Sequence, residues 1–491
     1  MSTQAASDCG TVQAMSPSTL TPTGAPLAAD FVLPDAALLA KYDKPGPRYT
    51  SYPTADRFVE AYGAADYQQA LTLRGSALGA APTPLSLYVH IPFCQSLCYY
   101  CACNKIITKQ QSRSIAYLDL LKQEIKMHAA ALGGHKAAVS QVHFGGGTPT
   151  FLTDAQLTDL WAALQDSFNL LPDGEYAIEI DPRTVSHERL AHLAQLGFNR
   201  LSFGVQDFDP AVQKAVHRVQ SFEQVESLMA SARSLGFESI NLDLIYGLPL
   251  QSTETLVRTL AQVNSLRPER IALYSYAHLP QRFKPQRRID DHKLPAASEK
   301  LAMFNLALQT LHEQGYDYIG MDHFALPSDS LAVAKRQGRL HRNFQGYSTQ
   351  ADCDLVGLGV SAIGKVGRHY CQNAKTMEEY ADAIAQGELP IVRGMVLSHD
   401  DLLRRAIIMA IMCQGRLDFE AVGLAWLLNF REVFAEELAR LRELEADGLL
   451  LFDEDGFCLT AQGWLMVRAV AMVFDKYCQS ELLRARYSKI I

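Results

Sequence analysis

Residues 88–105 read "YVHIPFCQSLCYYCACNK" and place four cysteines within ten positions, directly after an apolar run. Cys94, Cys98 and Cys101 follow the spacing C-x3-C-x2-C, and Cys103 comes two positions later. In a loop after a strand, the first three thiolates can converge on one centre. Zinc is the structural alternative, but structural zinc sites usually combine two separated pairs of ligands. An iron–sulfur cluster suits the compact spacing better, and a cluster held by three cysteines leaves one iron open to an external ligand.

Outward from this loop, the chain repeats one unit from residue 85 onward: an apolar run, a loop with Gly or Pro, and an amphipathic helical stretch. Six such β-α units predict a parallel sheet, as a partial barrel or as a doubly wound sheet. In both folds, chemistry gathers at the carboxyl ends of the strands, where the polar and glycine-rich residues lie in this sequence. The runs are "LSLYVHIP", "VSQVHFGGG", "YAIEIDP", "RLSFGVQ", "SINLDLIYG" and "RIALYSY".

The two ends of the chain differ from this repeat. Residues 1–34 are rich in Ala, Ser, Thr and Pro and contain no Lys or Arg, so they predict a disordered leader and neither a secretory signal nor a transit peptide. Residues 396–491 predict a small helical domain with a hairpin-like wing. Its helices carry at least as many acids as bases, which favours a lid or packing role over nucleic-acid binding.

The composition limits the partners and the compartment. The chain has 491 residues, is 48% hydrophobic and has a net charge of −8, which argues against nucleic acid or an anionic membrane as the main partner. No apolar run approaches the roughly 18–20 residues that span a bilayer. We therefore expect a cytoplasmic protein. In that reducing compartment, ten cysteines do not indicate a disulfide framework, and a tight group of four indicates metal or redox chemistry.

The C-x3-C-x2-C spacing, with the aromatic Tyr100 before the third cysteine, resembles the radical S-adenosylmethionine (SAM) superfamily. In that superfamily the open iron binds the amino and carboxylate groups of SAM, and an electron cleaves SAM to a 5′-deoxyadenosyl radical. Over residues 36 to 480, an ordered set of motifs resembles the oxygen-independent coproporphyrinogen III dehydrogenases of heme biosynthesis. The motifs are "GPRYTSYPTA", the cysteine stretch, "HFGGGTPTFL", "IEIDPR", "SFGVQDF", "INLDLIYGLP", "YSYAHLP" and "LHRNFQGY".

The resemblance implies a partial (β/α)6 barrel over residues 85–395, an N-terminal segment over residues 35–84 that folds over the active site, and the C-terminal domain. It implies a [4Fe-4S] cluster on Cys94, Cys98 and Cys101, and two molecules of SAM. A buried carboxylate needs a partner, and ribose hydroxyls would be partners for Glu179. The positions matched to the first SAM are Tyr88, Tyr100, Gly146, Gly147, Thr148, Glu179, Ala277 and Ile363, and those matched to the second are Gln206, Arg218 and Asp243.

The implied substrate, coproporphyrinogen III, carries four propionates, so its site needs several cations. Arg48 is one candidate, and the basic run at 335–342 offers Arg336, Arg339 and Arg342, although that run and "RFKPQRR" at 282–288 could equally be solvated surface. The resemblance implies that two of the propionates become vinyl groups and that an external electron donor and acceptor take part. We expect the enzyme to be a monomer. We expect Cys103 to be a neighbour needed for turnover, not a ligand. The alternatives are a heme chaperone of the same superfamily and a radical methyltransferase.

Overall fold

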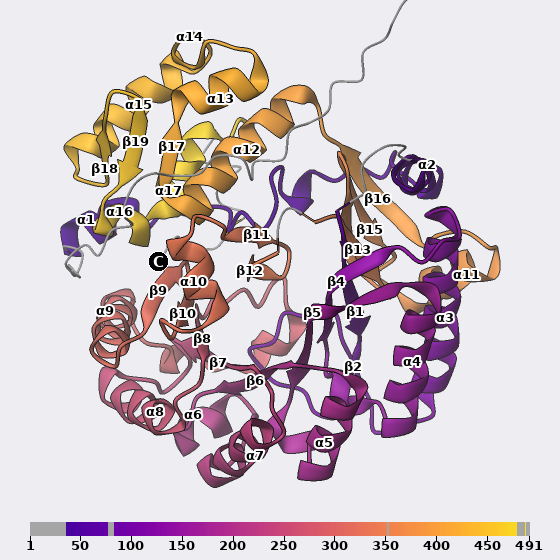
Figure 1. Ribbon diagram of the computed structural model, residues 1–491. Coiled ribbons are helices and arrows are strands. Elements are labelled where there is room, and N and C mark those ends of the chain that lie inside the picture. The colour runs from indigo at the N-terminus through magenta and orange to yellow at the C-terminus, as the bar shows by residue number, and fades with distance from the viewer. Residues whose placement is uncertain (1–35, 77–82, 351–352, 479–486, 488–491) are drawn as a thin grey trace, which may run out of the picture.

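The computed structural model describes residues 36–76, 83–350, 353–478 and 487, so the expected leader at 1–34 lies outside the described residues. Six β-α units follow one another in the predicted order, and Figure 1 shows their helices along the outer side of an arc of strands. The units are β1 (Leu85–Ile91) with α3 (Arg113–Ala131), β4 (Ala138–Gly146) with α4 (Asp154–Ser167), β5 (Asn169–Ile180) with α5 (His187–Leu196), β6 (Arg200–Gln206) with α6 (Pro210–Ala215) and α7 (Phe222–Ser234), β7 (Ser239–Tyr246) with α8 (Thr253–Leu266), and β8 (Arg270–Ser275) with α9 (Ala297–Glu313).

These six strands are parallel and adjacent in the order β1-β4-β5-β6-β7-β8, which confirms the expected partial barrel. They form the centre of a 12-stranded sheet, whose edges the sequence analysis did not predict. The edge strands beyond β8 are β10 (His323–Ala325) and β9 (Asp317–Gly320), and those beyond β1 are β13 (Leu355–Leu358), β14 (Ile363–Val366), β15 (His369–Asn373) and β16 (Ile391–Val396).

Within the central strands, apolar and polar side chains alternate between the two faces of the sheet. In β6, Leu201, Phe203 and Val205 are buried, whereas Ser202 and Gly204 on the other face are half-buried. The same alternation holds in β7. Because successive side chains in a strand point to opposite faces, the apolar face packs against the helices and the polar face lines the inside of the arc. The strands are therefore less uniformly apolar than a parallel sheet covered on both faces would require.

The C-terminal unit is mostly helical, as predicted, and shares an apolar core with the N-terminal segment and with the β9–β10 edge of the sheet. Its wing is a three-stranded sheet in the order β17-β19-β18, formed by β17 (Arg416–Asp418), β18 (Leu450–Phe452) and β19 (Gly456–Leu459). Its helices are α12 (His399–Gln414), α13 (Phe419–Trp426), α14 (Phe430–Val433), α15 (Ala435–Ala446), α16 (Ala461–Leu465) and α17 (Val467–Ala471). Among the helices that the structure describes, none is both long and apolar enough to cross a membrane.

The N-terminal segment lies between this unit and the sheet. It contains α1 (Ala36–Tyr42) and α2 (Ala64–Gly75), which flank the stretch "RYTSYPT" at 48–54. Tyr49 and Tyr52 are fully buried in the same core as the C-terminal helices. Tyr49 donates a hydrogen bond to Asp475 at 2.9 Å, and Tyr370 of β15 donates to the Tyr52 carbonyl at 3.2 Å. The segment is thus bonded to the C-terminal unit through Asp475 and to the sheet through Tyr370.

Candidate functional site

The cysteine loop begins where β1 ends. Two short strands, β2 (Phe93–Cys94) and β3 (Ile106–Ile107), pair in parallel and close the loop at its base. Inside it, Cys94 and Cys98 are buried and Cys101 is partly buried. The Tyr99 N–H donates to the Val216 carbonyl at 3.0 Å, which attaches the loop to the segment after α6. The three cysteines of the C-x3-C-x2-C spacing are therefore held at the carboxyl end of the parallel strands.

Cationic and hydroxyl donors surround the cysteine sulfurs. Arg183 and Arg218 each place a guanidinium nitrogen 3.5 Å from Cys98 Sγ. Both arginines also pair with Asp181, at 2.7 Å and 3.3 Å. Thr148 Oγ1 donates to Cys94 Sγ at 3.4 Å. Hydrogen bonds to the sulfurs are among the features that tune a protein-bound iron–sulfur cluster. Arg183, which follows "IEIDP" directly, was not among the predicted site residues.

Cys103 differs from the other three cysteines because it is exposed. Its thiol donates a hydrogen bond to Cys101, which lowers the pKa of Cys101 to about 6 and raises the pKa of Cys103. Within the described part of the chain, no three His, Cys, Asp or Glu side chains are grouped so that they could hold a single metal ion. A single zinc ion would need such a group.

The glycine-rich turn after β4 packs closely against the base of this loop. Gly146 has a φ of +113°, which a residue with a side chain rarely adopts. A Cβ on Gly147 would lie 2.7 Å from the Pro92 carbonyl oxygen. The N–H groups of Gly147 and Thr148 donate to the Ile91 and Phe93 carbonyls at 2.8 Å and 2.9 Å. These N–H groups therefore fix the turn and are not free to bind a ligand. A ligand with an amino group would be bound through backbone carbonyl oxygens.

Glu179 lies in β5 on the inner face of the sheet, beside this turn. Its carboxylate accepts from His143 Nε2 and from the Gly146 N–H, both at 3.2 Å. Burial opposes ionisation, but these hydrogen bonds outweigh it and lower the pKa of Glu179. The Tyr88 ring stacks on His143 with ring centres 6.0 Å apart. Tyr88 and Glu179 thus lie close together, and His143, which was not among the predicted site residues, lies between them and contacts both.

Gln206, Arg218 and Asp243 meet around Gly204 of β6. A Cβ on Gly204 would lie 3.0 Å from both the Gln206 and the Arg218 side-chain nitrogens, and Gly204 is the register partner of Asp243. Asp243 accepts from Ser202 at 3.0 Å and from Asn241 at 2.8 Å. Burial, with Glu179 nearby, raises the pKa of Asp243 to about 6. The three side chains therefore form one polar site next to Cys98 and Glu179.

The remaining candidates for the first SAM lie around the same space. Gln286 Nε2 donates to the Tyr100 carbonyl at 3.0 Å and to the Ala277 carbonyl at 3.2 Å, so it ties the loop after β8 to the cysteine loop. Gly357 of β13 is the register partner of Tyr88, and its Cβ position would be 2.6 Å from the Ile363 carbonyl. Tyr100, Ala277 and Ile363 are all partly buried.

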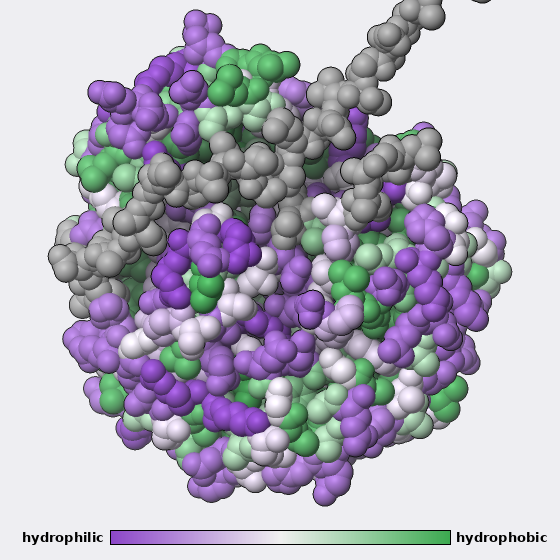
Figure 2. Space-filling model, viewed as in Figure 1, coloured by the Kyte–Doolittle hydropathy of each residue, from purple (hydrophilic) through white to green (hydrophobic). Residues whose placement is uncertain are grey.

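The four candidate arginines for the substrate separate into two groups. Arg342 of β11 (His341–Asn343) is buried and donates twice to the Arg48 carbonyl, at 3.2 Å and 3.1 Å. Arg336, the last residue of α10 (Ser330–Arg336), and Arg339 are exposed and bond to Asp317 and Gln337. Figure 2 shows a hydrophilic patch over α10. The structure thus brings Arg48 and Arg342 together, and leaves Arg336 and Arg339 on the surface.

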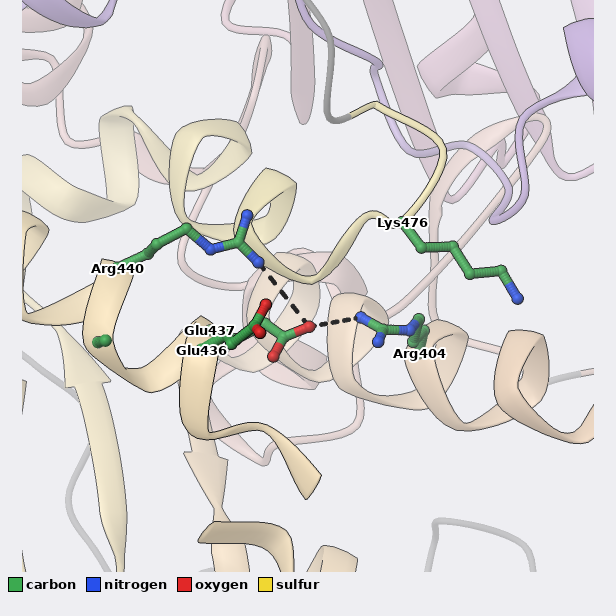
Figure 3. Close-up of a pocket in the computed structure, with 6 residues that line it drawn as sticks. Arg404, Glu436, Glu437, Arg440 and Lys476 are labelled. Atoms are coloured by element: carbon green, nitrogen blue, oxygen red, sulfur yellow. Dashed lines mark hydrogen bonds and ion pairs between the residues drawn. The ribbon is translucent and has the colours of Figure 1, made fainter. Parts of the chain in front are cut away.

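A separate surface pocket of about 590 Å³ lies between α12 and α15 (Figure 3). Three of its charged side chains pair with one another: Glu437 lies 2.9 Å from Arg404 and 3.8 Å from Arg440. Figure 1 places these helices on the opposite side of the molecule from β2. The pocket is therefore remote from the cysteine loop.

A partial barrel that holds a C-x3-C-x2-C loop at the carboxyl ends of its strands defines an iron–sulfur enzyme of the radical SAM class. Residues 88–263 match the sequence model of the radical SAM superfamily, and residues 397–466 match that of the HemN C-terminal domain. Membership of the superfamily implies a [4Fe-4S] cluster and SAM.

Comparison with individual proteins narrows the class to one family. The chain is 49% identical over 464 residues to the oxygen-independent coproporphyrinogen III oxidase of Pseudomonas aeruginosa, covering 94% of this chain and 100% of that protein. It is 46% identical to the Escherichia coli enzyme of that name, over 93% and 98% of the two chains. The solved structure of the E. coli coproporphyrinogen III oxidase HemN, described as a radical SAM enzyme, matches with a TM-score of 0.85 over 90% and 99% of the two chains. The chain belongs to the family of oxygen-independent coproporphyrinogen III oxidases, which confirms the resemblance in the ordered motifs.

Proposed function

We propose that this chain converts two propionate side chains of coproporphyrinogen III to vinyl groups, giving protoporphyrinogen IX without oxygen. The observation that carries the proposal is the placement of Glu179, Arg218 and Asp243 beside the cysteine loop, in a chain related to such oxidases over almost its whole length. Each propionate loses one hydrogen atom, one carbon dioxide and one electron. An external electron donor and an external electron acceptor complete the electron balance.

In this proposal, three thiolates hold the cluster: Cys94, Cys98 and Cys101. The donors to two of these sulfurs support a bound anionic cluster. When bound, the cluster and SAM together supply a 5′-deoxyadenosyl radical that removes a hydrogen atom from the substrate. The chain binds and orients the reactants and excludes water, since the cofactors carry the difficult chemistry. Tyr88, Tyr100, Glu179, Ala277, Ile363 and the turn residues Gly146, Gly147 and Thr148 would position the first SAM.

An anaerobic assay tests the proposed function directly. Protein reconstituted with iron and sulfide, then supplied with SAM, a reductant and coproporphyrinogen III, should release carbon dioxide and protoporphyrinogen in a ratio of two to one, as two decarboxylations require. A heme chaperone would bind heme and give neither product. A radical methyltransferase would give a methylated product and no carbon dioxide. Either of those results would replace the proposed function.

The site around Gly204 supports a second SAM, held by Gln206, Arg218 and Asp243. We expect Asp243→Ala and Gln206→Ala to lower coproporphyrinogen conversion by about tenfold or more, because a lost charged hydrogen bond costs about 1.5–3 kcal/mol. Both variants should keep the iron content and melting temperature of the wild type. Arg218→Lys is less suitable, because Arg218 also contacts Cys98 and Asp181. Full activity in both variants would contradict the second molecule.

The raised pKa of Asp243 predicts a pH dependence. An acid whose pKa is about 6 is ionised above that pH and neutral below it. The sulfonium of SAM is cationic, so its binding should weaken as the pH falls through 6, seen as a rise in the KM for SAM. Asp243→Asn is neutral at every pH, and its KM should be high and flat across this range. The same pH profile in wild type and Asp243→Asn would assign the titration to another group.

A further inference from the structure

Arg342 is a buried cation whose charge is not matched in the described structure. Only 6% of the residue is exposed. Its Nε and Nη2 donate to the Arg48 carbonyl, its guanidinium lies 4.6 Å from the Tyr347 ring centre, and its Nη1 is buried without a hydrogen-bond partner. None of the carboxylates that the structure describes pairs with Arg342. A buried charge is costly unless it is paired and hydrogen-bonded, so this guanidinium indicates a missing anion.

Arg48 provides a second cation beside Arg342, and unlike Arg342 it is paired with a carboxylate. Asp322, in the turn between β9 and β10, pairs with Arg48. The Arg48 side chain is 34% exposed, so one side of the pair is accessible. Burial and the neighbouring Arg342 lower the pKa of Arg48, and both arginines also lower the pKa of buried Arg468. Asp322 pairs with Arg48 and leaves the charge of Arg342 unpaired, so a further carboxylate would balance Arg342.

His323 adds a polar group to the same place. Its ring lies edge-on to the rings of Tyr274 and Tyr347, with centres 6.0 Å and 5.7 Å apart. Its Nδ1 is buried without a partner. Burial and the nearby arginines lower the pKa of His323 to about 3, so the ring is neutral at pH 7 and carries one N–H. Arginine and histidine donors that lack a partner in one place are suited to a carboxylate.

Tyr274 relates this group of residues to the proposed active site. It lies in β8, where Ile245 of β7 is its register partner, and Asp243 is two positions earlier in β7. The Arg48 guanidinium lies 5.7 Å from the Tyr274 ring centre, while burial and the charge of Asp243 raise the pKa of Tyr274. The arginines and Asp243 are therefore on the inner side of the sheet, with Tyr274 between them.

We propose that Arg48, Arg342 and His323 form a carboxylate subsite, which binds one propionate that is not undergoing oxidation. This rests on the proposed function for the identity of the substrate. The separation by Tyr274 makes the subsite an anchor for the far side of the tetrapyrrole. Because Arg342 also holds the Arg48 carbonyl, a bound propionate would fix the N-terminal segment over the substrate as well.

Binding of coproporphyrin III, the stable oxidised form of the substrate, tests the subsite without turnover. A tetra-amide of the same porphyrin, which lacks all four charges, is the reference ligand. We expect Arg342→Gln to raise the Kd for coproporphyrin by about tenfold to a hundredfold, the effect of one charge-assisted hydrogen bond of about 1.5–3 kcal/mol. The Kd for the tetra-amide should stay unchanged. Arg342→Lys should recover part of the loss, since it restores the charge without the planar fork.

Arg336→Gln is the matched control, because it makes the same change in the same basic run, at an exposed arginine paired with Asp317. It should leave both Kd values unchanged. Equal weakening of both ligands by Arg342→Gln would show a packing defect, and unchanged coproporphyrin binding would show no role; either result overturns the subsite. If Arg342→Gln does not fold, Arg48→Gln at the more exposed position decides by the same comparison.

The test is separable from the proposed function. A wild type that produces protoporphyrinogen, with a variant that keeps the wild-type KM for coproporphyrinogen, would remove the subsite and leave the function standing. A wild type that fails to convert coproporphyrinogen would remove the function. The difference in Kd between the two porphyrins would still decide whether Arg342 binds a carboxylate.

Discussion

The Cys98→Ser variant should contain almost no cluster iron and convert no measurable coproporphyrinogen. Three thiolates are the fewest ligands in the proposed arrangement, so the loss of one leaves two corners of the cluster unbound. Cys98 is also the sulfur that two cations approach, Arg183 and Arg218, each at 3.5 Å. A serine there would leave their charges facing a neutral hydroxyl. Iron and sulfide analysis of anaerobically purified protein, with its visible absorbance, measures the effect.

Cys458→Ser is the control for this prediction. Cys458 is a partly buried residue of β19, in the wing of the C-terminal unit, and the same sulfur-to-oxygen change there should keep the full iron content and activity. Cys94→Ser and Cys101→Ser should behave as Cys98→Ser does. A colourless wild-type protein that binds zinc and keeps full activity would reject the iron–sulfur assignment altogether.

The fold was predictable where the signal was local and repeated. Each of the six apolar runs became a parallel strand, with boundaries near those expected, because long apolar segments bury the same face against the following helix. The edge strands were not predicted. Strands such as β10 (His323–Ala325) and β14 (Ile363–Val366) are short, and they become strands only because a neighbouring strand offers hydrogen-bond partners. That condition is tertiary and is not visible in a window of sequence.

The candidate site divides in the same way. The cysteine loop and the glycine turn were predictable because each lies in one short stretch with an unusual composition. The pairing of Arg48 with Arg342 joins residues 294 positions apart, and nothing in either local sequence distinguishes Arg342 from Arg339. The difference is in burial: Arg342 lies within β11, whereas Arg339 follows α10 at the surface. Only the packing of the N-terminal segment against β11 makes Arg342 a buried, anchoring cation, while Arg339 stays solvated.

Cys103 presents the opposite case, a residue that the sequence places beside the cluster without giving its role. It is exposed and donates its thiol hydrogen to Cys101, so it lies next to a proposed ligand. Lys105 Nζ donates to the carbonyls of Cys101 and Cys103 at 3.1 Å and 3.3 Å, which fixes this short turn of the loop. If Cys103 held the fourth iron, the cluster would have no open position for SAM. The proposed function therefore requires that Cys103 is not a ligand.

Cys103→Ser should keep the full iron content and still change its cluster spectrum when SAM is added, while losing most coproporphyrinogen oxidation. The retained iron separates this variant from Cys101→Ser, which should lose the cluster. The retained spectral change separates a defect at the substrate from a defect in SAM binding. Cys103→Ala completes the series, because it removes the donor to Cys101 without adding a hydroxyl, and it should be at least as defective in turnover. Full turnover in both variants would mean that Cys103 is only a packed neighbour. Loss of iron from Cys103→Ser would instead make it a ligand, and the open coordination position, with the radical chemistry that depends on it, would have to be abandoned.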